Sequence, residues 1–400
     1  MQQPTLNPQP TKKFALFELG FRPFFLLASV FSIIATLLWM ASYTFGKSLP
    51  LSNYITPIAW HGHEMVFGYS VAIIAGFLLT AVRNWTGVPT IKGWTLASLA
   101  LAWLLARVLP LAGLPLLFEW AALFDLAFLL GLIVAVIHPI AKVKQWRQLL
   151  IVSILVLILT ADIVYYLGVL HIVNQGVSWG LFSGVYLIMA LIFTLSRRVM
   201  PFFIERGVGY KVQIKNWSFI DSSSLLFLVA LWLTDVFFKQ ALLTALLSAV
   251  LAVVHSVRLW GWHTNGIWKK PLLWVLFLGY SMFVLGFVLK AINFFNLYPT
   301  SIPLHAFTYG GIGMMSLGMI SRISLGHTGR NINEPPKIVT WVFLSLFVGA
   351  LVRVILPILV PSAYLHIIGL AQLLWLIAFV LFISAYFMIF IKPRADGQPG

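Results

Sequence analysis

The chain has 400 residues, of which 61% are hydrophobic and 9% are charged, and its formal net charge is +16. A chain with so few charged residues cannot be a soluble globular domain. The positive net charge, which would suggest a nucleic-acid partner in a soluble protein, is therefore not evidence for one here. The chain contains no cysteine, which excludes disulfides, iron–sulfur clusters and copper–thiolate sites.

Apolar stretches recur along the whole chain, and a membrane-spanning helix needs about 20 such residues. They predict an all-α integral membrane protein with about twelve transmembrane helices in a single polytopic domain, residues 1–400. The connections between the helices are short. The expected spans are 24–45, 63–83, 93–110, 115–138, 148–170, 176–197, 218–238, 241–261, 271–290, 303–323, 338–360 and 363–391.

Lys and Arg alternate between dense and sparse connections along this series of spans. Cytoplasmic loops gather cations, so the pattern predicts both termini, residues 1–22 and 392–400, on the cytoplasmic side. The span over 63–83 then enters the membrane from the outer side. His61, His63 and Glu64 are expected at its outer end.

Several other histidines share that membrane level. The topology puts His305, His366 and His171 at outer helix ends as well. Imidazole is the commonest side-chain ligand for iron, copper and zinc. Ionisable side chains inside a membrane are costly and usually functional. The alternative is that such histidines are interfacial residues that cap their helices.

An internal repeat connects the second and tenth spans. When His63 is placed over His305, four further identities follow without gaps: Gly68 and Gly310, Gly76 and Gly318, Thr86 and Thr328, Gly87 and Gly329. The two histidines lie eight helices apart, which allows a repeat of four-helix units. The layout is analogous to that of the main subunit of haem–copper oxidases, in which the second and tenth helices hold a haem between them. Coincidence remains the alternative, because glycines are common in membrane helices.

Five short motifs resemble the NnrS family, haem- and copper-containing membrane proteins of the bacterial nitric-oxide response. The resemblance runs nearly end to end and depends on the order and spacing of the motifs. They are Gly20-Phe21-Arg22-Pro23-Phe24-Phe25, Trp60-His61-Gly62-His63-Glu64-Met65 with Phe67-Gly68, Gly76-Phe77-Leu78-Leu79-Thr80-Ala81-Val82 with Asn84-Trp85-Thr86-Gly87, Arg198-Val199-Met200-Pro201-Phe202-Phe203, and Ser324-Leu325-Gly326-His327-Thr328-Gly329-Arg330.

The resemblance implies haem and copper as cofactors, nitric oxide or a related small molecule as partner, and protection against nitrosative stress. It also implies the bacterial inner (cytoplasmic) membrane. It supplies no reaction, so no enzymatic activity is assigned. One departure is visible at Phe277, where a histidine is expected in many relatives. If that histidine is a ligand elsewhere, one metal site is altered here.

The expected haem ligands are His63 and His305, with Gly68 and Gly310 as clearance for the macrocycle. His61 lies about 200° away from His63 around a helix, so it is expected to point elsewhere. It is a candidate copper ligand or a residue that orients a ligand. Glu64 can orient a ligating imidazole or accept a proton, or it can lie there because the helix dipole favours an acid. His366 is a further metal candidate at the outer level.

A second group is expected on the inner side. Arg322 and Arg330 flank His327 in a Gly-rich turn, which suits haem propionates or a phosphate. His327 is therefore a candidate for a second metal site, with His255 as its partner.

Two other functions remain open from the residues alone. A twelve-helix transporter would show a repeat of six helices, whereas the identities above lie eight helices apart. A haem or copper delivery factor would use the same ligands and release the metal. The sequence predicts no nucleic-acid partner and leaves the oligomeric state open.

Overall fold

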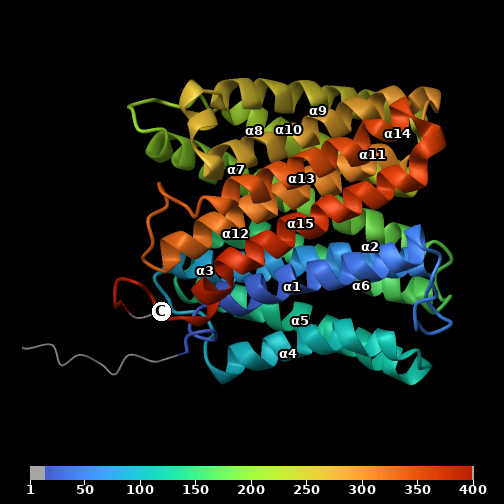
Figure 1. Cartoon of the computed structure of the whole chain (residues 1–400), viewed down its shortest axis with the longest axis horizontal. Helices are drawn as coiled ribbons and strands as arrows, with labels where there is room; N and C mark the ends of the chain where they lie inside the picture. The colour runs from blue at the N-terminus through green and yellow to red at the C-terminus, as the bar shows by residue number, and fades with distance from the viewer. Residues whose placement is uncertain (1–13, 399–400) are drawn as a thin grey trace, which may run out of the picture.

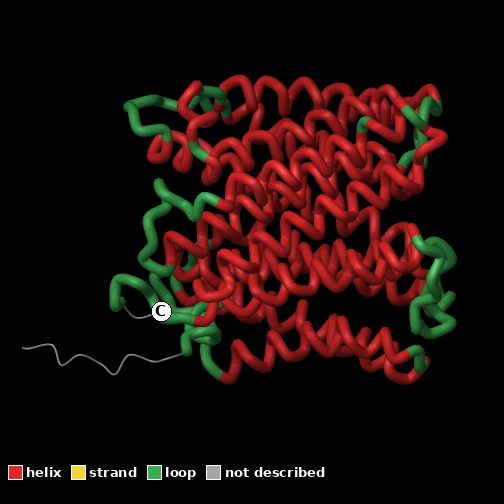
Figure 2. The backbone as a smooth tube through the Cα atoms, in the orientation of Figure 1, coloured by secondary structure: helices red, strands yellow, loops and turns green. Residues whose placement is uncertain are grey.

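The computed structural model describes residues 14–398, and all regular structure in this range is helical (Figures 1 and 2). Residues 1–13 of the expected N-terminal segment and residues 399–400 of the tail lie outside the described range. The helices are α1 (Phe21–Trp39), α2 (Pro57–His63), α3 (Val71–Thr86), α4 (Trp94–Val108), α5 (Pro115–Lys142), α6 (Leu149–Val169), α7 (Gly176–Gly207), α8 (Ser218–Trp232), α9 (Ala241–Trp262), α10 (Pro271–Ile292), α11 (Ser301–His305), α12 (Met314–His327), α13 (Ile338–Val354), α14 (Leu356–Leu359) and α15 (Tyr364–Ile391).

Within the described residues, 11 helical segments are long and apolar enough to cross a membrane. The expectation of an all-α, multi-span membrane protein is thus confirmed. The remaining expected span, 303–323, is also helical, as α11 and α12 joined by a π-helical segment. It is rich in glycine and serine, which lowers its apolar character compared with the other spans.

The second and sixth spans extend furthest beyond their expected limits. The second begins at Pro57, because Thr56 caps it: the Thr56 Oγ1 accepts a hydrogen bond from the Ala59 amide at 3.3 Å. The sixth, α7, continues through Pro201 to Gly207, so about half of the loop expected after residue 197 is helical.

The second and tenth spans share one unusual local structure. In each, a short α-helix ends at a histidine, a π-helical segment follows, and a longer α-helix completes the span. The π-helical segments are η2 (Glu64–Ser70) after His63 and η8 (Ala306–Gly313) after His305. π-helical turns are rare and occur frequently at functional sites. This parallel agrees with the internal identities, although the four-helix repeat itself stays a prediction.

The first and last helices meet at one end of the bundle. The Ala15 amide donates to the Ile391 carbonyl at 2.9 Å. The buried Arg22 donates from Nη1 to three carbonyls at the end of α15, those of Ile389, Phe390 and Lys392, at 2.7–3.0 Å. Arg22 therefore satisfies carbonyls that the end of a helix leaves unpaired.

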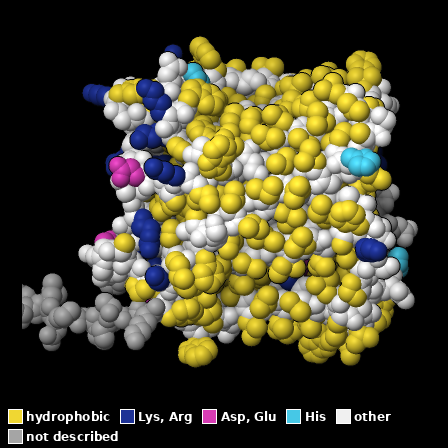
Figure 3. All heavy atoms as spheres, in the orientation of Figure 1, with side chains coloured by type: hydrophobic (Ala, Val, Ile, Leu, Met, Phe, Trp, Pro, Cys, Tyr) yellow, Lys and Arg dark blue, Asp and Glu magenta, His cyan; other side chains and the backbone are white. Residues whose placement is uncertain are grey.

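Lys and Arg side chains gather at this same end on the face shown in Figure 3, near the C-terminus marked in Figure 1. The middle of that face is covered by hydrophobic side chains. We call this the cationic end. The span that begins with α2 starts at the opposite end (Figure 1).

Candidate functional site

Five ionisable side chains are buried together toward the end opposite the cationic end. They are His63, Glu64, Arg107, Asp125 and Asp162, and none is more than 3% exposed. We call them the carboxylate cluster. They come from α2, η2, α4, α5 and α6, so the first half of the chain builds the cluster by itself. Such a concentration of charge inside apolar helices is costly, which makes the cluster a candidate functional site.

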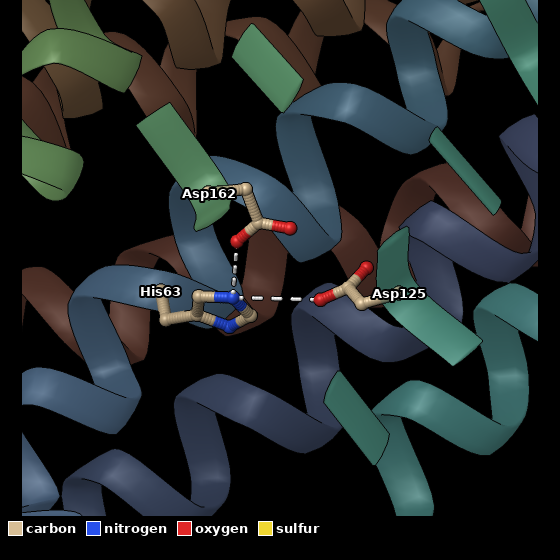
Figure 4. Close-up of side chains that lie close together, drawn as sticks. All are labelled: His63, Asp125 and Asp162. Atoms are coloured by element: carbon tan, nitrogen blue, oxygen red, sulfur yellow. Dashed lines mark hydrogen bonds and ion pairs between the residues drawn. The ribbon is translucent and has the colours of Figure 1, made fainter. Parts of the chain in front are cut away.

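His63 is at the centre of the cluster (Figure 4). Its Nε2 lies 3.0 Å from Asp162 Oδ1 and 3.4 Å from Asp125 Oδ2. Its Nδ1 lies 3.3 Å from Glu64 Oε1. Both ring nitrogens can donate to these oxygens only when the ring is protonated.

Arg107 connects the remaining carboxylates. Its Nη1 donates to Glu64 Oε2 at 2.8 Å, and its Nη2 pairs with Asp125 Oδ2. The Tyr166 hydroxyl donates to the same Asp125 oxygen at 3.0 Å. The Tyr165 ring stacks on His63 with 4.4 Å between centroids. The aromatic rings thus shield the charges from lipid and fix the imidazole plane.

The local helix geometry explains how adjacent residues reach one cluster. Glu64 begins the π-helical segment η2, whose wider turn changes the direction of the side chains after His63. Gly68 gives the ion pair its space: a Cβ there would lie 2.8 Å from Arg107 Nη1 and 2.9 Å from Glu64 Oε2. Gly68 is therefore placed against an ion pair inside the protein.

The charges of the cluster do not balance on their own. Three carboxyl groups face one guanidinium and one imidazole, so even a protonated His63 leaves an excess of negative charge if all three are ionised. Asp125 Oδ1 and Asp162 Oδ2 are buried without a hydrogen-bond partner. An uncompensated charge is very costly in this environment. A neutral cluster must therefore hold an additional proton or a cation.

The donor set could hold a metal. His63, Asp125 and Asp162 each offer a ligand atom, and these atoms lie within 4.8 Å of one another. One imidazole and two carboxylates suit Fe(II), Mn(II), Zn(II) or Cu(II) better than the soft ion Cu(I). If the imidazole is neutral, a divalent cation and the Arg107 guanidinium together balance the charge of the three carboxylates.

The packing at Gly68 leads to a prediction. Gly68→Ala is expected to destabilise the protein by about 1–3 kcal/mol, because the added methyl group separates Arg107 from Glu64. The matched control is Gly131→Ala, whose Cβ would meet only the terminal Leu99 Cδ1. Thermal unfolding in detergent should show a lower melting temperature for Gly68→Ala alone. Equal melting temperatures would contradict the role given to Gly68.

His61, His305 and Arg353 form a second polar group, which we call the imidazole group. His61 stacks on Trp39 at 4.4 Å with an angle of 2°, and its Nδ1 is buried without a hydrogen-bond partner. His305 Nδ1 lies 2.7 Å from the Ser301 carbonyl. Arg353 Nη2 lies 3.0 Å from His305 Nδ1 and 3.4 Å from Nε2. His61 and Arg353 both act electrostatically on His305.

The imidazole group is the electrostatic opposite of the carboxylate cluster. No Asp or Glu of the described residues forms an ion pair with Arg353, and its Nη1 is buried without a partner. Because Nδ1 of His305 faces a carbonyl, its Nε2 is left to accept from Arg353. Nδ1 of His61 has no hydrogen-bond partner. The group therefore suits a ligand that combines a metal with a carboxylate.

The structure separates residues that the sequence analysis grouped together. No hydrogen bond or ring contact joins His63 to His305 within residues 14–398. A Cβ at Gly310 would meet Met282 at 2.6 Å, so this glycine lets α10 approach. His366 is exposed near the start of α15.

The inner group is also divided. His327 lies near Phe21, with ring centroids 6.1 Å apart. Arg322 lies over the Phe203 ring, and Arg330 Nη1 lies 3.4 Å from the Thr328 carbonyl. His255 bonds through Nδ1 to the Tyr280 hydroxyl at 2.6 Å, away from His327.

Phe277 contacts His263, with ring centroids 5.8 Å apart. A histidine at position 277 in a relative would thus lie beside His263, at the cationic end. His263 is the exposed residue after α9.

Three members of the carboxylate cluster were not selected as site residues from the sequence: Arg107, Asp125 and Asp162. The available signal is their charge inside apolar spans, which indicates that the acids pair with Arg107 or Lys239 or mark a proton route. The structure pairs Asp125 with Arg107. Asp235 likewise pairs with Lys290 at 2.8 Å and with the Tyr186 hydroxyl at 2.8 Å.

An apolar cavity lies between α1, α3, α7 and the tenth span. It holds about 710 Å³ of empty space, including its mouth, and its wall includes Phe25, Ile73, Leu191 and Met315. No histidine and no charged side chain lines it. Such a cavity suits a small uncharged molecule that dissolves in lipid.

Comparison with known families gives one finding. The family model described as NnrS protein matches residues 15–394 of the chain. No curated protein matches the sequence. The match covers nearly the whole chain, including the carboxylate cluster and the imidazole group.

Proposed function

The chain belongs to the NnrS family of membrane proteins associated with the nitric-oxide response, and we propose that it binds haem and copper and meets nitric oxide at the haem. The observation that carries this proposal is the unused Nδ1 of His61, which is buried in the same group as Arg353, whose Nη1 also lacks a partner. Haem supplies an iron for an imidazole and propionates for a guanidinium.

We assign the iron to His61 and a propionate to Arg353. Trp39 holds the His61 ring flat. His305 positions Arg353 through Nε2 while its Nδ1 faces the Ser301 carbonyl. A haem held by one imidazole keeps an open coordination position for nitric oxide. His305 would become a second ligand only if Arg353 moved away from it.

The carboxylate cluster is the proposed copper site. His63 provides a nitrogen, and Asp125 and Asp162 provide oxygens. Glu64 and Arg107 orient these ligands and balance part of their charge. The proposal assigns Cu(II) here because carboxylate ligands are hard and the charge count favours a divalent ion.

Nitric oxide is uncharged and dissolves in lipid. The apolar cavity beside α3 and α7 is proposed as its route into the protein. The cationic end is proposed to face the cytoplasm of a bacterium, because cations favour that side. The two polar groups would then lie toward the outer side of the inner membrane.

The test is an absorption spectrum and a metal analysis of the full chain purified from haem- and copper-replete cells. The expected result is a Soret band that shifts when nitric oxide is added to the reduced protein. His61→Ala should lose that band, whereas His263→Ala, the matched control at an exposed position, should keep it. A wild-type protein without haem, or full haem occupancy in His61→Ala, would overturn the assignment.

A further inference from the structure

A small pocket at the cationic end lies between the end of α7, the start of α10 and the loop after α12. Its wall includes Gly207, Lys270, Leu272, Arg322 and Asn333. It holds about 240 Å³ of empty space, including its mouth. Most of this space is the open mouth, so a group bound there would lie at the opening, with the rest of its molecule outside.

Arg322 is the unusual member of this wall. It is 8% exposed, and its guanidinium carbon lies 3.9 Å from the centroid of the Phe203 ring. Among the described residues, it forms no ion pair and no hydrogen bond, and no charged side chain acts on it electrostatically. A guanidinium has five N–H donors. None of its nitrogens is among the fully buried side-chain atoms of the described residues, so these unused donors can be reached by an anion at the mouth of the pocket.

The start of α10 provides a second, independent attraction for an anion. The helix has 22 residues, begins with Pro271, and has no side-chain cap. The amides of Leu273 and Trp274 donate to the Lys270 carbonyl, but the Leu272 amide has no backbone partner. The helix dipole places partial positive charge at this point. The Lys270 side chain stands at the same helix start.

We propose that this pocket binds the phosphate group of an anionic phospholipid. Arg322 would donate to the phosphate oxygens, with the Leu272 amide and Lys270 as further donors. The cationic end is where the bundle meets the headgroup layer on one side of the membrane. Basic pockets between transmembrane helices on that side are suited to anionic headgroups. Free inorganic phosphate has the same chemistry and is the alternative source.

This inference is independent of the proposed cofactors. The pocket lies at the other end of the bundle from the carboxylate cluster, and it uses no residue of either polar group. A protein without haem or copper could therefore still bind the lipid, and a protein with both could lack the lipid site.

The test is thermal unfolding of the full chain in detergent during titration with phosphatidylglycerol, phosphatidylcholine or inorganic phosphate. We expect phosphatidylglycerol to raise the melting temperature and phosphatidylcholine to have little effect. Arg322→Gln should raise the half-saturating concentration of phosphatidylglycerol by roughly tenfold or more, because it removes the charge-assisted hydrogen bonds. Arg83→Gln, an exposed cation at the same end, is the matched control and should behave like the wild type.

Each other outcome has a defined meaning. Equal stabilisation by inorganic phosphate, lost in Arg322→Gln, would keep the phosphate site and overturn the lipid as its source. The absence of any anion effect, or an unchanged titration for Arg322→Gln, would overturn the site. If Arg322→Gln does not fold, Lys270→Gln is tested in its place. Lys270 is only half-buried, so its replacement disturbs the packing less. An unchanged titration for Lys270→Gln would then count against the proposal.

Discussion

Arg107→Met is expected to cause the largest loss of stability of any single substitution considered. The change leaves Glu64 and Asp125 as buried carboxylates without their cationic partner. Removing one member of a buried ion pair costs about 3–5 kcal/mol. The variant should therefore accumulate poorly in membranes, and its melting temperature in detergent should fall well below that of the wild type.

Arg83→Met is the control for the loss of an arginine. Arg83 is exposed near the end of α3, so its replacement should leave the melting temperature nearly unchanged. A triple variant, Arg107→Met with Glu64→Gln and Asp125→Asn, should recover part of the stability, because it also removes the unpaired charges. If Arg107→Met melts like the wild type, the cluster does not depend on this ion pair.

Loss of copper with retention of haem is the expected result for His63→Ala. In the proposed arrangement, His63 is the only nitrogen ligand of the copper, whereas the haem is held by His61. Asp162→Asn should also weaken copper binding, since it removes a carboxylate oxygen 3.0 Å from His63 Nε2. Copper per protein and the Soret band should be measured on the same preparation.

The same proposal predicts that copper binding displaces protons. Without metal, the neutral cluster holds a protonated His63 and one additional carboxyl proton, so Cu(II) should release about two protons per ion. A pH indicator in weak buffer would report this release in the wild type, and His63→Ala should show little. If His63→Ala keeps copper and loses haem, the two cofactors have been assigned to the wrong groups.

The fold class was accessible from the sequence because membrane insertion depends on a local property. Each span carries its own apolar stretch, and each cationic loop can be identified without its neighbours. The same local character explains why the limits of α7 were wrong: a helix that continues past Pro201 depends on its packing as well as its composition.

The composition of the site was partly accessible, whereas its pairing was not. His61, His63 and Glu64 were selected because ionisable side chains inside a membrane are costly and usually functional. Their separation by about 200° around a helix also predicted different directions for the two histidines. His61 indeed stacks on Trp39 while His63 faces Asp162.

Only the tertiary structure decided which groups share an environment. Arg107, Asp125 and Asp162 lie on three different helices, and their meeting with His63 depends on how α4, α5 and α6 pack against η2. The internal repeat suggested His305 as the partner of His63, because equivalent positions in two spans share a depth. The depth of a residue in the membrane is determined by the hydropathy along its span, which the sequence contains. The direction of its side chain around the helix depends on the neighbouring helices and on the π-helical turn, and these exist only in the folded chain.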